Sequence, residues 1–170
     1  MSDLIIPQQI LDELVAHARE LDPYECCGFL AGKDHTVSNI YRIKNIVSFE
    51  GAAQVASFDD AKVQHLSRLS AEERAEIAFI MDAQEMFQAV KDMRKLGLTL
   101  QVVYHSHPHD PARPSVTDIK IANEWEENWS RLNLTLPIYL LISLMDKSNP
   151  DIRGYWIKGG TVAPAQVTTP

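Results

Sequence analysis

The sequence contains little cysteine, and its two cysteines are adjacent. Among 170 residues, Cys26 and Cys27 are the only thiols. Neighbouring cysteines do not connect distant segments, so no disulfide framework is expected. There is no C-x-x-C pair either, so a zinc site built from thiolates is not supported. We therefore expect a protein of a reducing compartment, the cytoplasm.

Long apolar runs and an excess of basic residues are also missing. No stretch approaches the roughly 18 apolar residues that a membrane-spanning helix needs. Residues 1–4 lack the basic region of a signal peptide. The formal net charge of -7 argues against general nucleic-acid binding, which requires a basic face. We expect neither a membrane partner nor a nucleic-acid partner.

Length and composition are those of an ordinary globular domain. The 170 residues are 45% hydrophobic and 23% charged, which is typical of one domain. We predict a single domain over residues 1–160 and a flexible tail over residues 161–170. Helix and strand patterns mix without strict alternation, which predicts an α/β protein (α+β) with a mixed sheet flanked by helices.

Two histidines stand at the end of an apolar, β-branched segment. Residues 98–104 predict a strand, and strand side chains alternate between faces, so His105 and His107 share one face and Ser106 takes the other. Pro108 ends the strand. Two imidazoles side by side make half of a zinc site, although such a pair also occurs at partly exposed strand ends.

A serine and an aspartate follow after a short loop that is stiffened by prolines. Ser115-x-x-Asp118 matches a helix capping box, and a carboxylate in the first helical turn can also reach back to the histidines as a third metal ligand. The two roles are compatible, since Ser115 can cap while Asp118 binds a metal. His109 is a rival third ligand, but Pro108 and Pro111 argue against a strand that continues so far.

An acidic residue lies far upstream of the histidines. Glu25 precedes a small apolar segment, residues 26–31, that predicts a buried strand in which Gly28 permits close backbone approach. Glu25 is either a solvated acid after a turn or a catalytic residue beside the metal site. The remaining histidines are expected at the surface: His17, His35 and His65.

Taken together, these residues resemble the signature of the JAMM (MPN+) metalloprotease family, in particular its small prokaryotic members. The similarity covers roughly residues 5–158. It implies a cytidine-deaminase-like α-β-α sandwich, the JAMM/MPN domain. The matching motif is a glutamate before a Cys-Gly pair, then His-x-His, seven residues, serine, two residues and aspartate: Glu25, Cys27-Gly28, His105, His107, Ser115 and Asp118.

The resemblance also implies a role for each site residue. His105, His107 and Asp118 would hold one Zn²⁺ per chain, which lowers the pKa of a bound water to about 7 and polarises the scissile carbonyl. Glu25 would be the general base, and Ser115 would donate a hydrogen bond to the oxyanion.

The expected substrate is a ubiquitin-like sulfur-carrier protein that is cleaved after its C-terminal Gly-Gly. Eukaryotic members cut ubiquitin isopeptide bonds with the help of two inserted segments. Residues 118–137 are nearly all predicted helix and leave little room for the second insert. Residues 59–76 look like extra sequence beside the active-site groove.

Two other functions stay open. One is a non-catalytic MPN scaffold that binds partner proteins, and the other is a zinc hydrolase of small amides. Metal content separates the scaffold from the enzymes. The resemblance also leaves a homodimer open.

Overall fold

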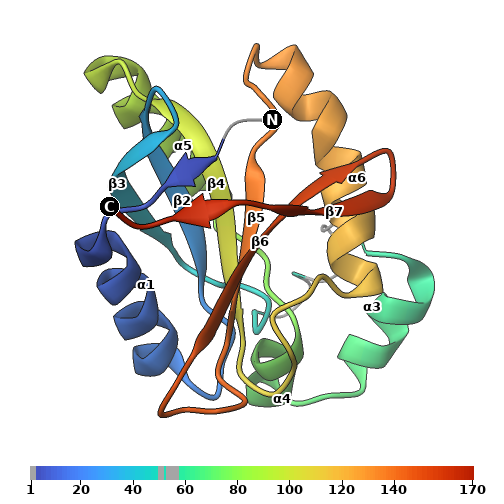
Figure 1. Ribbon diagram of the computed structural model, residues 1–170. Coiled ribbons are helices and arrows are strands. Elements are labelled where there is room, and N and C mark those ends of the chain that lie inside the picture. The colour runs from blue at the N-terminus through green and yellow to red at the C-terminus, as the bar shows by residue number, and fades with distance from the viewer. Residues whose placement is uncertain (1–2, 50–51, 53–57) are drawn as a thin grey trace.

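The computed structural model describes residues 3–49, 52 and 58–170 (Figure 1). Its helices within these ranges include α1 (Gln8–Leu21), α3 (Asp60–Ser67), α4 (Ala71–Ile77), α5 (Ala83–Leu96) and α6 (Val116–Arg131). Its strands are β1 (Leu4–Ile5), β2 (Cys27–Lys33), β3 (Thr36–Ile43), β4 (Thr99–His107), β5 (Ile138–Ser143), β6 (Asp151–Lys158), β7 (Thr161–Ala165) and β8 (Val167–Thr168). Among the described residues, no helix has the length and apolar character needed to cross a membrane.

The strands of the described residues form one mixed sheet. Eight strands follow the order β7-β6-β5-β4-β2-β3-β1-β8. The central strand, β4, is antiparallel to β2 and parallel to β5. This arrangement, with helices packed on the sheet, confirms the predicted mixed sheet flanked by helices.

Alternation along β2 and β4 divides the core between the two faces of the sheet. One cluster contains Leu30, Val102 and Tyr104 together with the buried side chains of α1. The other contains Phe29 and Val103 with buried side chains of α5 and α6. His105 and His107 continue the alternation of Val103, so they belong to the face that α5 and α6 cover.

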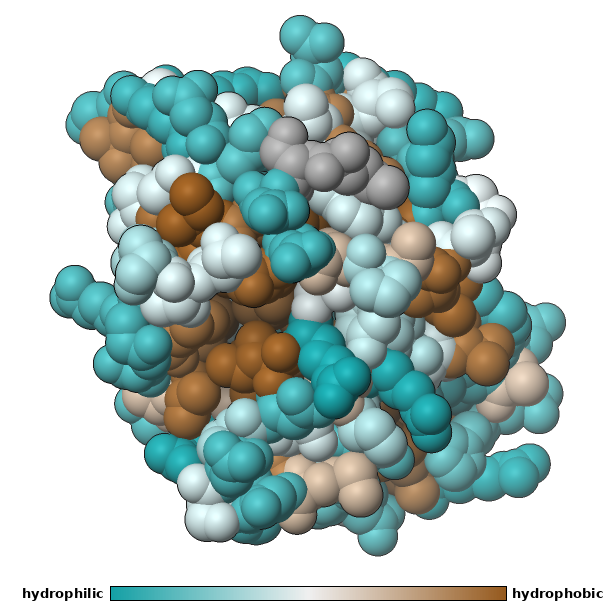
Figure 2. All heavy atoms as spheres, in the orientation of Figure 1, coloured by the Kyte–Doolittle hydropathy of each residue, from teal (hydrophilic) through white to brown (hydrophobic). Residues whose placement is uncertain are grey.

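Residues 161–168 do not form the loose tail that was expected. β7 pairs with β6, and β8 pairs with β1. Only Gln166 separates β7 from β8, so this segment connects the two ends of the strand order and crosses the front of Figure 1 in red. Ala165 and Val167 pack against the α1 side of the core. Figure 2 shows hydrophobic side chains gathered at the centre-left of the same face, framed by hydrophilic ones.

A second expectation, that His17 lies at the surface, is also wrong. His17 is only 5% exposed, and its Nδ1 lies 2.8 Å from the hydroxyl of Tyr104. The reason is its position on α1, where it falls on the buried face with Leu14 and Ala18. A hydrogen bond to Tyr104 satisfies the ring in that apolar setting.

Candidate active site

Three side chains bring their ligand atoms together at the end of β4. The Nε2 atoms of His105 and His107 are 3.0 Å apart, and each lies 3.3 Å from Oδ2 of Asp118. Four ligands placed tetrahedrally at zinc–ligand distances of 2.0–2.1 Å are about 3.3–3.4 Å from one another. The observed spacing and the donor set, two imidazole nitrogens and a carboxylate oxygen, therefore fit a zinc ion.

The register of the sheet places Glu25 beside these ligands. β2 runs antiparallel to β4, with Cys27 opposite His105, so the next matching positions are Glu25 and His107. Side chains two residues apart share a face, which directs Glu25 to the side of the histidines. Its backbone N–H donates to the carbonyl of Ala75 in α4 at 2.7 Å, and the residue is 6% exposed.

The loop between β4 and α6 orients His107. Nδ1 of His107 lies 2.9 Å from the carbonyl oxygen of Pro111. Because a carbonyl only accepts, Nδ1 carries the proton and Nε2 keeps its lone pair for a metal. Hydroxyl groups of β5 and β6 hold the neighbouring loop carbonyls at 2.6 and 2.5 Å: Ser143 to Asp110 and Tyr155 to Ala112.

Ser115 and Asp118 form the predicted capping box at the beginning of α6. The N–H of Asp118 donates to Oγ of Ser115 at 3.1 Å, and the N–H of Ser115 donates to Oδ2 of Asp118 at 2.8 Å. The same Oδ2 faces both histidines, so one carboxylate can cap the helix and bind a metal. Within the described part of the chain, the Ser115 hydroxyl proton has no acceptor.

Burial and neighbouring charges set the protonation of the site. Burial lowers the pKa of His105, which favours the neutral ring that a metal ligand requires. Burial opposes ionisation of Asp118, but contacts with both histidines and with the Ser115 N–H hold the pKa of its carboxyl well below its usual range. Burial and the charge of Asp118 raise the pKa of Glu25 well above its usual range.

A pocket of about 330 Å³ is lined by four of the predicted site residues. Residues 59–76, expected as extra sequence, contribute α3, which lies next to the lower end of α6 (Figure 1), and most of α4. Lys62 of α3 lines the pocket, as does Arg113 of the loop after β4. The predicted site residues that line it are Glu25, His107, Ser115 and Asp118.

Asn45 positions Glu25, and sequence reasoning did not identify it. Its Nδ2 donates to the carbonyls of Glu25 and Ala78 at 3.1 and 3.0 Å. Its Oδ1 accepts from the N–H groups of Val47 and Ile80 at 3.1 and 3.0 Å. An asparagine just after a strand is a common loop residue, so the sequence holds no signal for this role.

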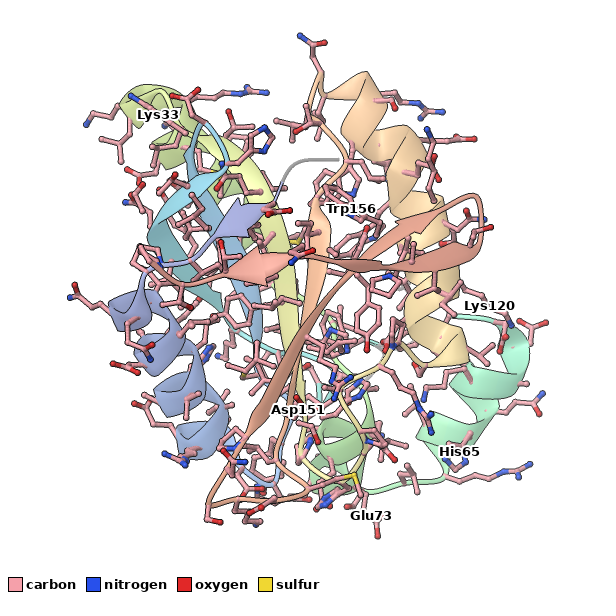
Figure 3. All side chains as sticks on the ribbon, viewed as in Figure 1. Lys33, His65, Glu73, Lys120, Asp151 and Trp156 are labelled. Carbon is pink, nitrogen blue, oxygen red and sulfur yellow. The ribbon has the colours of Figure 1, made fainter. Side chains whose placement is uncertain are left out.

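The other candidate histidines lie away from the ligand cluster. Nε2 of His109 is 3.0 Å from Oε2 of Glu76, so His109 is engaged by α4 rather than by the ligand cluster. His35 is exposed in the turn between β2 and β3. His65 is exposed on α3 (Figure 3). The surface predictions for His35 and His65 are therefore confirmed.

Comparison with known proteins gives consistent matches over most of the chain. A model of the prokaryotic homologs of the JAB domain matches residues 7–158. The CysO-cysteine peptidase of Mycobacterium tuberculosis is 29% identical over 164 residues, which cover 96% of this chain and 89% of the relative. A "probable TtuB-protein conjugate cleaving protease" of Thermus thermophilus is 30% identical over 119 residues, covering 70% of this chain and 63% of the relative.

A solved structure matches the fold along nearly the whole chain. The solution structure of a Desulfitobacterium hafniense protein aligns with a TM-score of 0.67 and 28% sequence identity. The alignment covers 98% of this chain and 92% of that protein.

Proposed function

The chain belongs to the prokaryotic JAB branch of the JAMM/MPN family, and on this basis we propose that it is a zinc-dependent peptidase. Its proposed reaction is hydrolysis of the amide bond after the C-terminal Gly-Gly of a ubiquitin-like sulfur-carrier protein. The observation that carries the proposal is the convergence of His105, His107 and Asp118, whose ligand atoms lie within 4.8 Å of one another. The substrate class is supported by the names of two relatives, the CysO-cysteine peptidase and the probable TtuB-protein conjugate cleaving protease.

His105, His107 and Asp118 would hold one zinc ion. When bound, the ion supplies Lewis acidity that polarises the scissile carbonyl and acidifies water, and its charge favours the ionised form of Glu25. The neutral ring of His105 and the ionised carboxyl of Asp118 are the protonation states that ligation requires. The Pro111 carbonyl fixes the orientation of His107.

Glu25 and Ser115 supply the proton chemistry. A water oxygen adds to the amide carbon while Glu25 accepts a water proton, and Glu25 then passes that proton to the nitrogen as the C–N bond breaks. The products are a Gly-Gly carboxylate and a free amine. The uncommitted hydroxyl proton of Ser115 donates to the oxyanion that forms on the way. Both side chains line one pocket, which lets them act on one bond.

Metal analysis tests the proposal first. Wild type purified without added zinc should carry about one zinc ion per chain, and His107→Ala should lose it. His65→Ala is the matched control, because it removes an exposed histidine from α3. A wild-type protein that contains no zinc and does not bind added zinc would overturn the proposed peptidase activity and favour the partner-binding scaffold.

Cleavage assays then test the roles and the substrate. Glu25→Gln should keep its zinc and lose cleavage, because the amide cannot accept the water proton. Retained cleavage in this variant would assign the base elsewhere. The substrate is a carrier protein that carries one residue after its Gly-Gly, compared with a short unrelated amide. Faster cleavage of the short amide would favour a hydrolase of small amides.

A further inference from the structure

Two cationic side chains line the proposed active-site pocket, and no ion pair holds either of them among the described residues. Lys62 comes from α3 and Arg113 from the loop between β4 and α6, and both line the pocket that contains Glu25. Among the described residues, neither forms an ion pair within 4.0 Å, whereas Lys120 nearby is paired with Asp59. In a chain of formal net charge -7, two unpaired cations in one pocket indicate an anionic ligand.

Lys62 stands on a segment that the fold holds in place. The side chain of Asp59 accepts a hydrogen bond from the backbone N–H of Lys62 at 2.8 Å. The same carboxylate pairs with Lys120 of α6, which extends toward the beginning of α3 (Figure 3). This connection ties α3 to the helix whose first turn supplies Asp118.

Arg113 is tied to the metal ligands through the loop backbone. Its N–H donates to the carbonyl of Pro111 at 2.8 Å, and that carbonyl also accepts from His107. The backbone of Arg113 is therefore held in place relative to the proposed zinc ligands.

The charges around this pocket favour the binding of a ligand carboxylate close to the scissile bond. Burial raises the pKa of Glu25, and the positive charge of Lys62 opposes that rise, which indicates that Lys62 acts near the general base. Asp118 is engaged with the histidines and with its helix cap. Asp110 is the other carboxylate that lines the pocket, and it is exposed.

We propose that Lys62 and Arg113 bind the α-carboxylate of a single residue released from the Gly-Gly tail, so that the chain prefers carboxypeptidase cleavage over isopeptide cleavage. This inference rests on the proposed function and adds its selectivity. Arginine and lysine are the side chains best suited to a carboxylate. A single released residue carries its carboxylate next to the scissile bond, whereas a lysine linked through its side chain does not.

The size of the pocket agrees with this selectivity. Its volume of about 330 Å³ is at the lower end of ligand pockets, which span about 300–1,000 Å³. Such a volume suits one released residue better than a folded leaving group.

Three matched substrates test the inference on the zinc-loaded wild type. One carrier ends in Gly-Gly-Cys with a free carboxylate, the second is its C-terminal amide, and the third is joined through an isopeptide bond to lysine. Because hydrogen bonds to charged groups contribute about 10- to 100-fold in affinity, the acid should be cleaved about 10- to 100-fold faster in kcat/KM than the amide. Equal rates for acid and amide would overturn the inference while leaving the peptidase intact.

Variants identify the residues responsible. Arg113→Gln should lower kcat/KM for the acid about tenfold and leave the amide unchanged. Lys62→Gln should lower kcat/KM for the acid about tenfold more than for the amide, because loss of its charge near Glu25 affects both substrates. Lys91→Gln, an exposed lysine on α5, is the matched control and should alter neither. An equal loss for both substrates in the two pocket variants would contradict carboxylate recognition.

A binding measurement keeps the inference separable from the proposed reaction. Zinc-loaded Glu25→Gln is titrated calorimetrically with a Gly-Gly-Cys peptide and with its amide. The acid should bind about 10- to 100-fold more tightly, and the Lys62→Gln/Arg113→Gln pair should abolish the difference. Selective binding, combined with a zinc-loaded wild type that cleaves no carrier, would overturn the proposed function alone, whereas equal binding would overturn the carboxylate site.

Discussion

Replacing Asn45 by alanine should weaken both the fold and the reaction. The Asn45 side chain makes four hydrogen bonds to backbone groups. A typical hydrogen bond contributes a net 0.5–1.5 kcal/mol, and Asn45 is half-buried, so we expect a loss of about 2–4 kcal/mol in the free energy of unfolding. Urea denaturation measures this loss. Asn39→Ala on β3 is the control, because within the described residues the Asn39 side chain accepts a single exposed hydrogen bond, from Ser38.

The catalytic consequence follows from what Asn45 holds. Its Nδ2 anchors the carbonyl of Glu25 to the segment after α4, so its removal leaves the proposed base less well placed. A displacement of about 1 Å costs about 100-fold in rate, and we expect kcat to fall by about 10- to 100-fold. The zinc content should remain, since the hydrogen bonds of Asn45 go to none of the three proposed ligands.

A second substitution separates stability from positioning. Asn45→Asp keeps an oxygen for the N–H groups of Val47 and Ile80 but loses the donor to Glu25. It should recover part of the stability without recovering kcat. If Asn45→Ala loses the expected stability and keeps the wild-type kcat, Asn45 stabilises the fold without positioning Glu25, and the reasoning is refuted.

Three further predictions concern metal, pH and packing. The free energy of unfolding should be about 4 kcal/mol lower with a chelator than with free zinc at about 1,000 times its Kd. Thermal melts should show no such loss in His107→Ala, and equal melting temperatures for zinc-loaded and zinc-free wild type would argue against the site. Burial lowers the pKa of His17 from 6.5 to about 4. As the pH falls from 6.5 to about 4, His17 is protonated in the unfolded chain but not in the folded one, so the free energy of unfolding should fall by up to about 3 kcal/mol. His17→Gln should lack this component in urea titrations, and an unchanged pH slope would contradict it. Gly28→Ala should cost about 2–3 kcal/mol in urea denaturation, because a Cβ would lie 2.3 Å from the Tyr41 carbonyl oxygen and 2.5 Å from the Tyr104 hydroxyl; wild-type stability would show that β2 relaxes around it.

Local rules were sufficient to predict the histidine pair and the helix cap. Alternation along a strand places His105 and His107 on one face wherever the strand lies. The capping box of Ser115 and Asp118 depends only on a spacing of three residues. Both features were predicted from neighbouring residues, because short-range geometry determines them.

The position of Glu25 depends on pairing between distant segments. Glu25 meets His107 because β2 is antiparallel to β4 in one particular register. A shift by one residue would send Glu25 to the opposite face, and no pattern within either strand specifies that register. Only the family resemblance connected the two segments at the level of sequence.

Two errors have different physical origins. His17 was assigned to the surface from its residue type, although its spacing from Leu14 and Ala18 already placed it on the buried face of α1. Residues 161–168 were assigned to a tail because they are short of large apolar side chains, but their backbone groups pair with β6 and β1. Local spacing was sufficient to avoid the first error, whereas the β1 partner of residues 167–168 lies far along the chain and has no local signal.

The pairing of β1 with β8 sets a condition on how the protein folds. Leu4 and Val167 are partners across 163 positions of the chain, and closing a loop of that length costs about 4.5 kcal/mol in chain entropy. Until residue 168 has been synthesised, β1 and β6 each lack their partner in this segment, and unpaired edges are where chains associate wrongly. One late segment, which contains β7 and β8, then covers both edges. We expect nascent chains that stop short of β7 to depend most on chaperones.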